Sequence, residues 1–327
     1  MLEKLNQARG CLAGLAIGDA LGRPVEGLSI AEIEANYGEI TQFLDESIQG
    51  TDDTEFAILT ATTLIENGLN ATADDFADSW RNKLMHQTKP LIGAGFSELS
   101  TLRNLRLGLV PPSSGFHSAS WSDGLAMRVA PIGIAAHHDA ELACKLAISD
   151  GEVSNAGEGI FGGIAVALAV ALAMNDCPTN EILEQVLIKL PENSWLSRNL
   201  KKIKQIIHEH KDLSTRELRH MLTKEIAIAS YPFSELAPEA VALAFATLLI
   251  NEDNFEEALL FAVNLGRDTD TIAAICGAVL GAKVGYNALP NSWTNQLKPA
   301  LGSCLEFSAG IDLVALAPEL LALKAAK

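Results

Sequence analysis

The sequence predicts an all-α protein, and two patterns support this. Apolar side chains recur at spacings of three and four along most of the 327 residues, and few segments alternate as strands do. Glu or Gln near the start of several segments, and Gly, Asn or Pro after them, resemble helix ends. We therefore expect a single domain over residues 1–327, with helices over 3–21, 54–67, 73–85, 122–136, 139–149, 156–174, 179–190, 196–210, 214–228, 236–250, 254–264, 270–284 and 313–325.

Composition limits the classes of protein that fit. Apolar residues make up 48% of the chain, which favours a globular core over disorder. The net charge of −17 argues against a nucleic-acid partner bound through a basic face. The uncharged run over 159–174 is shorter than the roughly 20 residues of a membrane span, so we expect a buried helix there and no membrane partner. Five scattered cysteines and a start without an export signal predict a cytoplasmic protein.

Two segments differ from the rest of the chain. The stretch Lys89–Gly124 is rich in Pro, Gly and Ser, and it predicts mobile loops with a short helix inside. The stretch over 180–223 is more polar and carries a basic run, Arg198–Lys204, which is typical of a solvated face. We expect this second stretch to form a peripheral helical insert, because no linker divides the chain.

Glycines four residues apart form two ridges, at Gly10, Gly14, Gly18 and Gly22 and at Gly277, Gly281 and Gly285. Each glycine inside a helix costs about 1 kcal/mol relative to alanine, so a tertiary contact must offset the loss. Residues four apart lie on one helix face, where hydrogen atoms in place of side chains let another backbone approach. The ridges therefore predict close helix packing rather than direct contact with a ligand.

Two acidic clusters stand at predicted helix starts. One combines Thr51, Asp52, Asp53 and Thr54, and the other combines Asp268 and Asp270 with Thr271. Capping of the first helical turn explains part of each cluster. Carboxylates that meet in a core repel unless a cation lies among them, and hard divalent cations prefer such oxygen atoms. An EF-hand that begins at Asp268 is excluded by Ala273 and Val279, and no HExxH, GxSxG or Walker motif occurs.

Four motifs in order carry a family resemblance: GLAIGDALGRPVEG, GTDDTEFAILT, SDGLAMRVAPIG and VNLGRDTDTIAAICGAVLGA. They resemble the ADP-ribosylglycohydrolase family from about residue 5 to residue 290. The resemblance implies a compact orthogonal helical bundle with two metal ions, Mg²⁺ or Mn²⁺. It implies metal ligands at Thr51, Asp52, Asp53, Asp268, Asp270 and Thr271, catalytic roles for Glu26 and Asp53, and substrate contacts at Asp123, Asn155, Gly266 and Arg267.

Two positions depart from the family pattern. Many members have GGD where this chain has Gly266, Arg267 and Asp268, and many have His where Asn155 stands. Arg267 can meet a substrate phosphate or point to solvent, and the former is favoured. Asn155 offers hydrogen bonds but does not titrate. These changes bear on the substrate more than on the metals.

The resemblance implies a metal-dependent hydrolase that removes ADP-ribose from a protein or from a small ADP-ribosyl compound. Two metal ions can hold ribose hydroxyls and activate water, and Glu26 is implied to be a mobile acid–base residue near the scissile bond. One alternative is hydrolysis of a simpler N-riboside or nucleoside. Another is a binding or structural protein without turnover, against which the intact ligand set argues.

Overall fold

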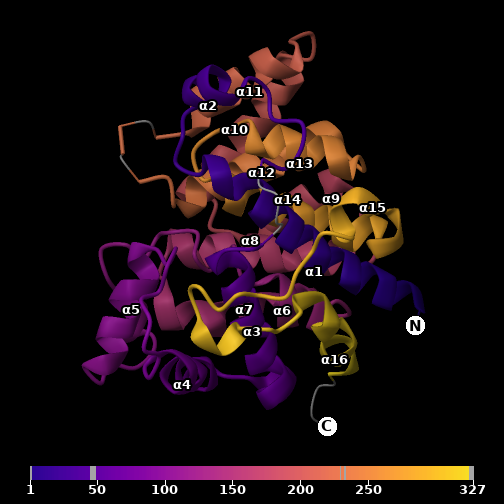
Figure 1. Cartoon of the computed structure of the whole chain (residues 1–327). Coiled ribbons are helices and arrows are strands. Elements are labelled where there is room, and N and C mark those ends of the chain that lie inside the picture. Colours follow the sequence, from indigo (N-terminus) through magenta and orange to yellow (C-terminus); the bar gives the residue numbers. More distant parts are fainter. Residues whose placement is uncertain (1, 45–48, 229, 232, 324–327) are drawn as a thin grey trace.

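The computed structural model describes residues 2–44, 49–228, 230–231 and 233–323, and all regular elements in these ranges are helices (Figure 1). The α-helices are α1 (Leu2–Gly22), α2 (Ile30–Tyr37), α3 (Asp52–Asn67), α4 (Ala73–Leu84), α5 (Phe96–Arg106), α6 (Ala130–Ala135), α7 (Ala140–Ser154), α8 (Glu158–Ala173), α9 (Thr179–Lys189), α10 (Trp195–Glu209), α11 (Thr215–Ile226), α12 (Ala237–Asn251), α13 (Phe255–Val263), α14 (Thr269–Val284), α15 (Asn291–Thr294) and α16 (Ala317–Ala322). Short 3₁₀ turns join several of them, including η1 (Arg23–Val25), η3 (Ser113–Gly115) and η6 (Leu313–Leu316).

The predicted all-α helical bundle is confirmed, with most helix ends within a few residues of those expected. The predicted helix over 122–136 is wrong in its first half, because only the second half is helical, as α6. Pro131 lies in the first turn of α6, and the residues before it form turns instead of a longer helix. The predicted helix over 313–325 divides into η6 and α16, and its positions 324–325 lie outside the described residues.

Helix α2 was not expected, although the sequence carries a signal for it. Ser29 accepts a hydrogen bond from the Glu32 amide, and the Glu32 carboxylate accepts one in return from the Ser29 amide at 2.8 Å. This reciprocal capping box satisfies two backbone donors at the helix start. The same motif begins α4 at Thr72 and α11 at Ser214. In α2 the helix is too short for the apolar spacing to show clearly.

Helices α1 and α14 lie side by side at the centre of the molecule and run antiparallel (Figure 1). A Cβ atom added at Gly14 would lie 1.9 Å from the Gly277 carbonyl oxygen, and one at Gly277 would lie 2.0 Å from that of Gly14. Gly10 meets Gly281 in the same way, and Gly18 meets the backbone at Ala273. The two glycine ridges therefore pack backbone against backbone, as the sequence predicted.

The antiparallel register brings the end of α1 next to the start of α14. A Cβ atom added at Gly22, the last residue of α1, would lie 2.4 Å from the Asp270 amide nitrogen. The Thr269 hydroxyl donates a hydrogen bond of 2.9 Å to the Gly22 carbonyl oxygen. Helix packing thus carries Glu26, just beyond α1, toward the acidic start of α14.

The surrounding helices complete one apolar core. Helix α8 packs against α6, α7, α12 and α14, and its apolar side chains are buried, as expected for 159–174. Among the described residues, no helix is both long enough and apolar enough to cross a membrane. The stretch over 180–223 forms α9, α10 and α11, of which α10 packs along α12. Its status as a peripheral insert stays a prediction.

The backbone contact at Gly277 yields a stability prediction. We expect Gly277→Ala to lower the free energy of unfolding by about 3 kcal/mol, because the added methyl group meets a fixed backbone carbonyl. Gly162→Ala in α8 is the matched control, since its Cβ would meet only side-chain atoms, the nearest at 3.0 Å. Urea unfolding should give a change below about 1 kcal/mol for the control. Equal losses in the two variants would contradict the packing argument.

Candidate functional site

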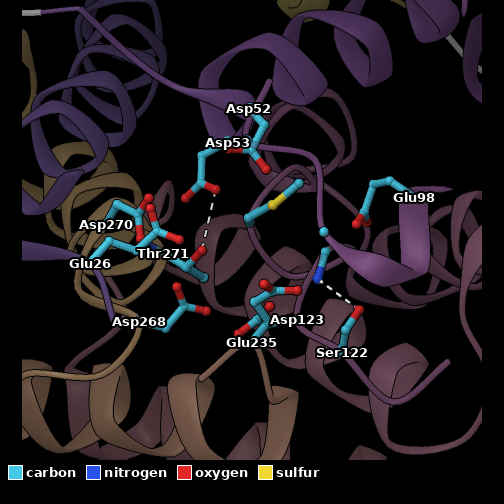
Figure 2. A pocket seen from close by; sticks show the side chains of 14 residues that line it. Glu26, Asp52, Asp53, Glu98, Ser122, Asp123, Glu235, Asp268, Asp270 and Thr271 are labelled. Atoms are coloured by element: carbon cyan, nitrogen blue, oxygen red, sulfur yellow. Dashed lines mark hydrogen bonds between the residues drawn. The ribbon is translucent and has the colours of Figure 1, made fainter. Parts of the chain in front are cut away.

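An acidic pocket lies where the start of α14, the residues after α1, and the starts of α3 and α5 meet the chain over 122–124. Carboxylates from separate parts of the sequence point into one space (Figure 2). They belong to Glu26, Asp52, Asp53, Glu98, Asp123, Glu235, Asp268 and Asp270. The cavity volume is about 20 Å³, which is the size of a water molecule or an ion rather than of a nucleotide.

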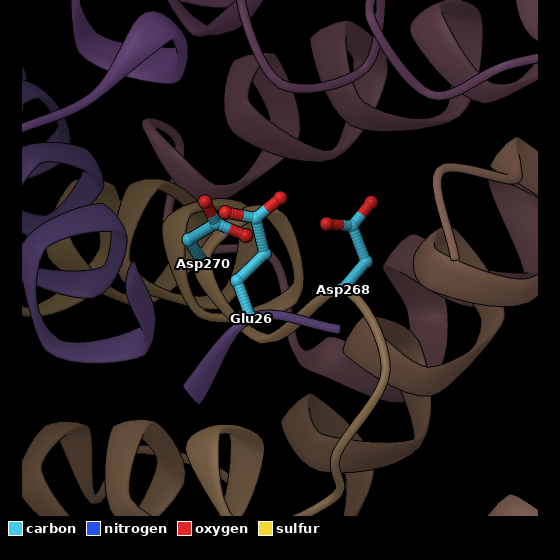
Figure 3. A group of neighbouring side chains, drawn as sticks. All are labelled: Glu26, Asp268 and Asp270. Carbon is cyan, nitrogen blue, oxygen red and sulfur yellow. The ribbon is translucent and has the colours of Figure 1, made fainter. Parts of the chain in front are cut away.

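Three of these carboxylates form the tightest group. Oxygen atoms of Glu26, Asp268 and Asp270 lie within 4.8 Å of one another (Figure 3). The neighbouring Thr271 hydroxyl donates a hydrogen bond of 3.2 Å to Asp53 Oδ1, which joins α14 to α3 (Figure 2). The two acidic clusters of the sequence therefore face each other.

Helix capping does not account for either cluster. Thr51 and Asp268 occupy the N-cap positions of α3 and α14, and neither side chain bonds an amide of its helix. The buried Asp19 of α1 caps α3 instead, accepting hydrogen bonds from the amides of Thr51 at 2.7 Å and Thr54 at 3.1 Å. This external cap leaves the carboxylates of Asp52 and Asp53 free of a structural task at the helix start.

Several buried carboxylate oxygens of the pocket have no hydrogen-bond donor. Within the described part of the chain, no donor bonds Asp53 Oδ2, Asp123 Oδ2, Asp268 Oδ2 or Glu98 Oε1. No Lys, Arg or His stands among the described residues that line the pocket. A buried polar atom without a partner is costly and calls for a ligand. Because the unpartnered atoms of these four acids are all carboxylate oxygens, the set fits a hard divalent cation.

Electrostatics leads to the same requirement. Burial raises the pKa of Asp53 well above its usual range, and the charges of Asp270 and Asp19 raise it further. Burial likewise raises the pKa of Asp270, and the nearby Asp268 and Glu26 add to the effect. A cation bound among these groups favours their ionised forms, so cation binding and proton release are coupled.

Glu26 is held by the backbone that surrounds it. It follows η1, and Gly27, with φ +77°, donates a 2.7 Å hydrogen bond from its amide to the Arg267 carbonyl oxygen. Burial raises the pKa of the Glu26 carboxyl, and its hydrogen bond with Asp270 lowers it in part. The residue is exposed, while its carboxylate meets those of α14. The implied mobility of Glu26 stays a prediction.

Asn155 lies outside the acidic pocket and supports one of its walls. Its amide nitrogen donates to the Ser120 and Ser122 carbonyl oxygens at 3.3 and 3.2 Å. Its amide oxygen accepts from Ser154, whose hydroxyl also accepts from the buried Arg128. Asn155 is therefore fixed by structural hydrogen bonds next to the turn that presents Asp123 to the pocket.

Arg267 is engaged within the protein, and its predicted contact with the substrate stays a prediction. Its guanidinium lies 2.6 Å from a carboxylate oxygen of the buried Glu239, and it also donates to three backbone carbonyls. Its side chain is only 13% exposed, so it does not point to solvent. Gly266, with φ +69°, leaves no room for a Cβ atom against the Leu28 carbonyl oxygen at 2.7 Å. Neither residue lines the acidic pocket.

Glu98 and Glu235 are pocket residues that the sequence did not identify. Ser122 donates to Ser97, and Ser97 donates to Glu98, both at 2.7 Å, so a hydroxyl chain orients that carboxylate. Gly124 leaves room for this carboxylate, since a Cβ atom there would lie 2.0 Å from Glu98 Oε1. Both acids lie outside the matched motifs, in segments that read as loops or as ordinary helix starts.

An aromatic hollow adjoins the acidic pocket and shares Ser122 and Glu235 with it. Its volume is about 290 Å³, and its walls carry Phe96, Trp121, Tyr231 and Phe233. The rings of Phe96 and Phe233 meet edge to face with centroids 5.2 Å apart, and those of Trp121 and Tyr231 do so at 5.7 Å. The hollow therefore offers flat aromatic surfaces beside the carboxylates.

The site has a direct test in metal binding. We expect Mn²⁺ to raise the melting temperature of the unaltered protein, and we expect Asp270→Asn to abolish that rise. A cation at a hundred times its dissociation constant stabilises the fold by about 2.7 kcal/mol. The metal-free variant should be as stable as the metal-free parent or more so, because one repelling carboxylate is gone.

Asp78→Asn is the control, because Asp78 pairs with Arg81 on the surface. Thermal scans and Mn²⁺ calorimetry on the three proteins give the answer. Unchanged Mn²⁺ affinity in the Asp270 variant would remove this residue from the cation site.

Comparisons with known proteins agree with the fold. A family model described as ADP-ribosylglycohydrolase matches residues 2–326. An uncharacterized protein of Archaeoglobus fulgidus is 36% identical over 298 residues, with 89% of this chain and 91% of that protein covered. The ADP-ribosylhydrolase ARH3 of Mus musculus is 27% identical, with 89% of this chain and 87% of its own covered. A solved structure titled "ADP-ribosylglycohydrolase-related protein complex" has a TM-score of 0.67 at 24% identity and covers 98% of this chain and 99% of its own.

Proposed function

Because the chain belongs to the ADP-ribosylglycohydrolase family, whose members hydrolyse glycosyl bonds, we propose that it cleaves the bond between an ADP-ribosyl group and its acceptor. The acceptor is a protein side chain or a small molecule. The observation that carries the proposal is the meeting of Glu26 with both Asp/Thr clusters in one pocket of unpartnered oxygens.

We assign two divalent cations, Mg²⁺ or Mn²⁺, to the acidic pocket. Thr51, Asp52 and Asp53 at the start of α3 hold one side, and Asp268, Asp270 and Thr271 of α14 hold the other. Thr51 does not line the pocket as its neighbours do, so its share in binding is the least direct. When bound, such ions orient ribose hydroxyls and lower the pKa of water.

The residues of the chain perform the remaining chemistry. Cleavage at the anomeric carbon of ribose develops positive charge on the sugar, and the surrounding carboxylates stabilise that charge. Glu26 lies at the edge of the group that it forms with Asp268 and Asp270. From there it transfers a proton to the leaving group or accepts one from the attacking water. Asp53 accepts a hydrogen bond from the Thr271 hydroxyl, and this bond fixes the starts of α3 and α14 relative to each other.

The aromatic hollow receives the part of the substrate beyond the ribose. The hollow has a volume of about 290 Å³ and can hold a nucleobase, whereas the acidic pocket, at about 20 Å³, is too small for one. An adenine ring stacks on such surfaces through the face of its π system. Asp123 lines the acidic pocket next to Ser122, which borders both cavities, and Asn155 donates a hydrogen bond to the Ser122 carbonyl oxygen.

A simpler N-riboside or nucleoside is the second candidate substrate, and one observation favours it. No Lys or Arg stands among the described residues that line either cavity, so a diphosphate would meet only hydroxyls, backbone amides and acids there. A binding or structural role without turnover is the third candidate. The complete set of ligand residues argues against it.

A substrate screen separates these candidates. We expect the protein, supplied with Mn²⁺ or Mg²⁺, to release ADP-ribose from an ADP-ribosylated protein or from a small ADP-ribosyl compound. Product formation is followed by chromatography, with added EDTA as the metal-free control. Release of base from nucleosides alone would replace the first proposal with the second. No turnover on any substrate would favour the third.

Substitution of Glu26 separates chemistry from metal binding. We expect Glu26→Gln to lower kcat by about 10²–10⁴-fold, the usual worth of general acid–base catalysis. Mn²⁺ affinity should stay within a few-fold of the parent value, since the rigid ligands of α3 and α14 remain. Glu32→Gln on the nearby exposed helix α2 serves as the control. Near-normal turnover in Glu26→Gln would show that Glu26 is a bystander.

A further inference from the structure

Arg267 connects three segments that build the two cavities. We propose that it is a positioning residue, which holds Glu26 and the aromatic wall formed by Tyr231 and Phe233 in place so that one substrate spans both cavities. The inference rests on the proposed function. It assigns Arg267 no contact with the substrate, in contrast to the phosphate contact that the sequence suggested.

The backbone of Arg267 clamps the Glu26 segment. The Gly27 amide donates to the Arg267 carbonyl oxygen at 2.7 Å, and the Arg267 amide donates to the Leu28 carbonyl oxygen at 2.7 Å. This pair of hydrogen bonds holds the residues after Glu26 against the residues before Asp268. Arg267 has φ +70°, in the left-handed region that glycine adopts most easily. The side chain must therefore offset an unfavourable backbone conformation.

The side chain of Arg267 anchors the aromatic wall. Its guanidinium donates to the carbonyl oxygens of Phe233 at 2.9 Å and of Ile228 and Tyr231 at 3.4 Å. Tyr231 and Phe233 line the hollow, and the described residues between α11 and α12 form turns and irregular backbone rather than a helix. The positions 229 and 232 of this stretch lie outside the described residues. Arg267 thus supplies side-chain hydrogen bonds to described residues that lie outside any helix.

The charge of Arg267 is already matched. Glu239, in the first turn of α12, is fully buried and accepts from Arg267 Nε at 2.6 Å. The other Glu239 oxygen accepts a hydrogen bond from the Ile228 amide at 2.7 Å. Both members of the ion pair, Arg267 and Glu239, therefore bind the backbone at Ile228. A guanidinium engaged in this way has its preferred planar partner and is not available to a phosphate.

These contacts predict a separable effect on kinetics. Loss of the side-chain anchors loosens the walls of the hollow. In the variant, substrate binding must therefore order aromatic side chains that are already ordered in the parent protein. The ligands on α3 and α14 stay in place, and glycine at position 267 keeps the backbone clamp. Affinity for a substrate that fills the hollow should fall, while the step at the ribose should change little.

The test compares Arg267→Gly with the parent protein. Glycine suits φ +70° and removes only the side chain. Arg267→Gly/Glu239→Gln is the second variant, because it also removes the buried charge that the first leaves unpaired. Arg216→Gly is the control: Arg216 pairs with Glu34 at 2.7 Å on an exposed surface and lines neither cavity.

Two readouts do not depend on turnover. Hydrogen exchange should quicken in the peptide over 227–237 of both Arg267 variants and stay unchanged in α14. Chymotrypsin should cut faster after Tyr231 or Phe233, which are 43% and 46% exposed. Unchanged exchange and cleavage would overturn the inference, whatever the enzyme acts on.

The third readout is the division between KM and kcat. On a substrate that carries ADP-ribose, KM should rise about tenfold and kcat should stay within about threefold, with unaltered Mn²⁺ affinity. ADP-ribose binding with Mn²⁺, measured by calorimetry, should weaken by the same factor as KM rises. A fall in kcat at constant KM would overturn the inference. Absence of turnover in the parent would refute the proposed function alone, and the exchange data would still decide the role of Arg267.

Discussion

The site depends on the contact between the backbones of α1 and α14. Where Gly14 meets Gly277, no atom larger than hydrogen fits between the helices, so their separation and register are fixed. The end of α1 then lies against the start of α14, which sets Glu26 beside Asp268. From the same helix Asp19 reaches the amides that begin α3. One pair of helices therefore positions all three groups of acidic side chains, although none of the ridge glycines lines the pocket.

The buried acidic side chains fall into two groups, which differ in whether hydrogen-bond donors and cationic side chains satisfy their oxygens. Asp150 is buried, yet Arg128 and Thr60 satisfy its oxygens, and Arg128 also lies over the ring of Trp80. Such a compensated pair supports the fold. The acids of the pocket have neighbours of the same sign, and no Lys, Arg or His lines the pocket in the part of the chain that the structure describes. Concentrated repulsion in an otherwise apolar core is a cost to stability, and proteins keep it where it serves a site. The contrast separates structural carboxylates from those of the candidate site.

The sequence predicted what depends on local patterns and on ordered motifs. Helical periodicity located most helices, and the glycine spacing predicted the close packing of α1 and α14. The acidic clusters were found, because Asp and Thr gather at two helix starts. Glu98 and Glu235 were missed, since tertiary structure alone brings them to the pocket and no spacing in the sequence marks them. The engagement of Arg267 was also beyond reach, because its partner Glu239 lies 28 residues away and reads as an ordinary first-turn glutamate.

The distance along the chain between α1 and α14 also governs how the protein folds. Helix α1 buries most of its residues, and its main neighbour is not complete until residue 284 has been synthesised. During synthesis, the face of α1 that packs against α14 therefore stays uncovered until almost the whole chain has been made. Contacts of such large sequence separation slow folding and leave intermediates open to aggregation. The amino-terminal helix is where a chaperone would be needed longest, and truncation within α14 would leave α1 without its main packing partner.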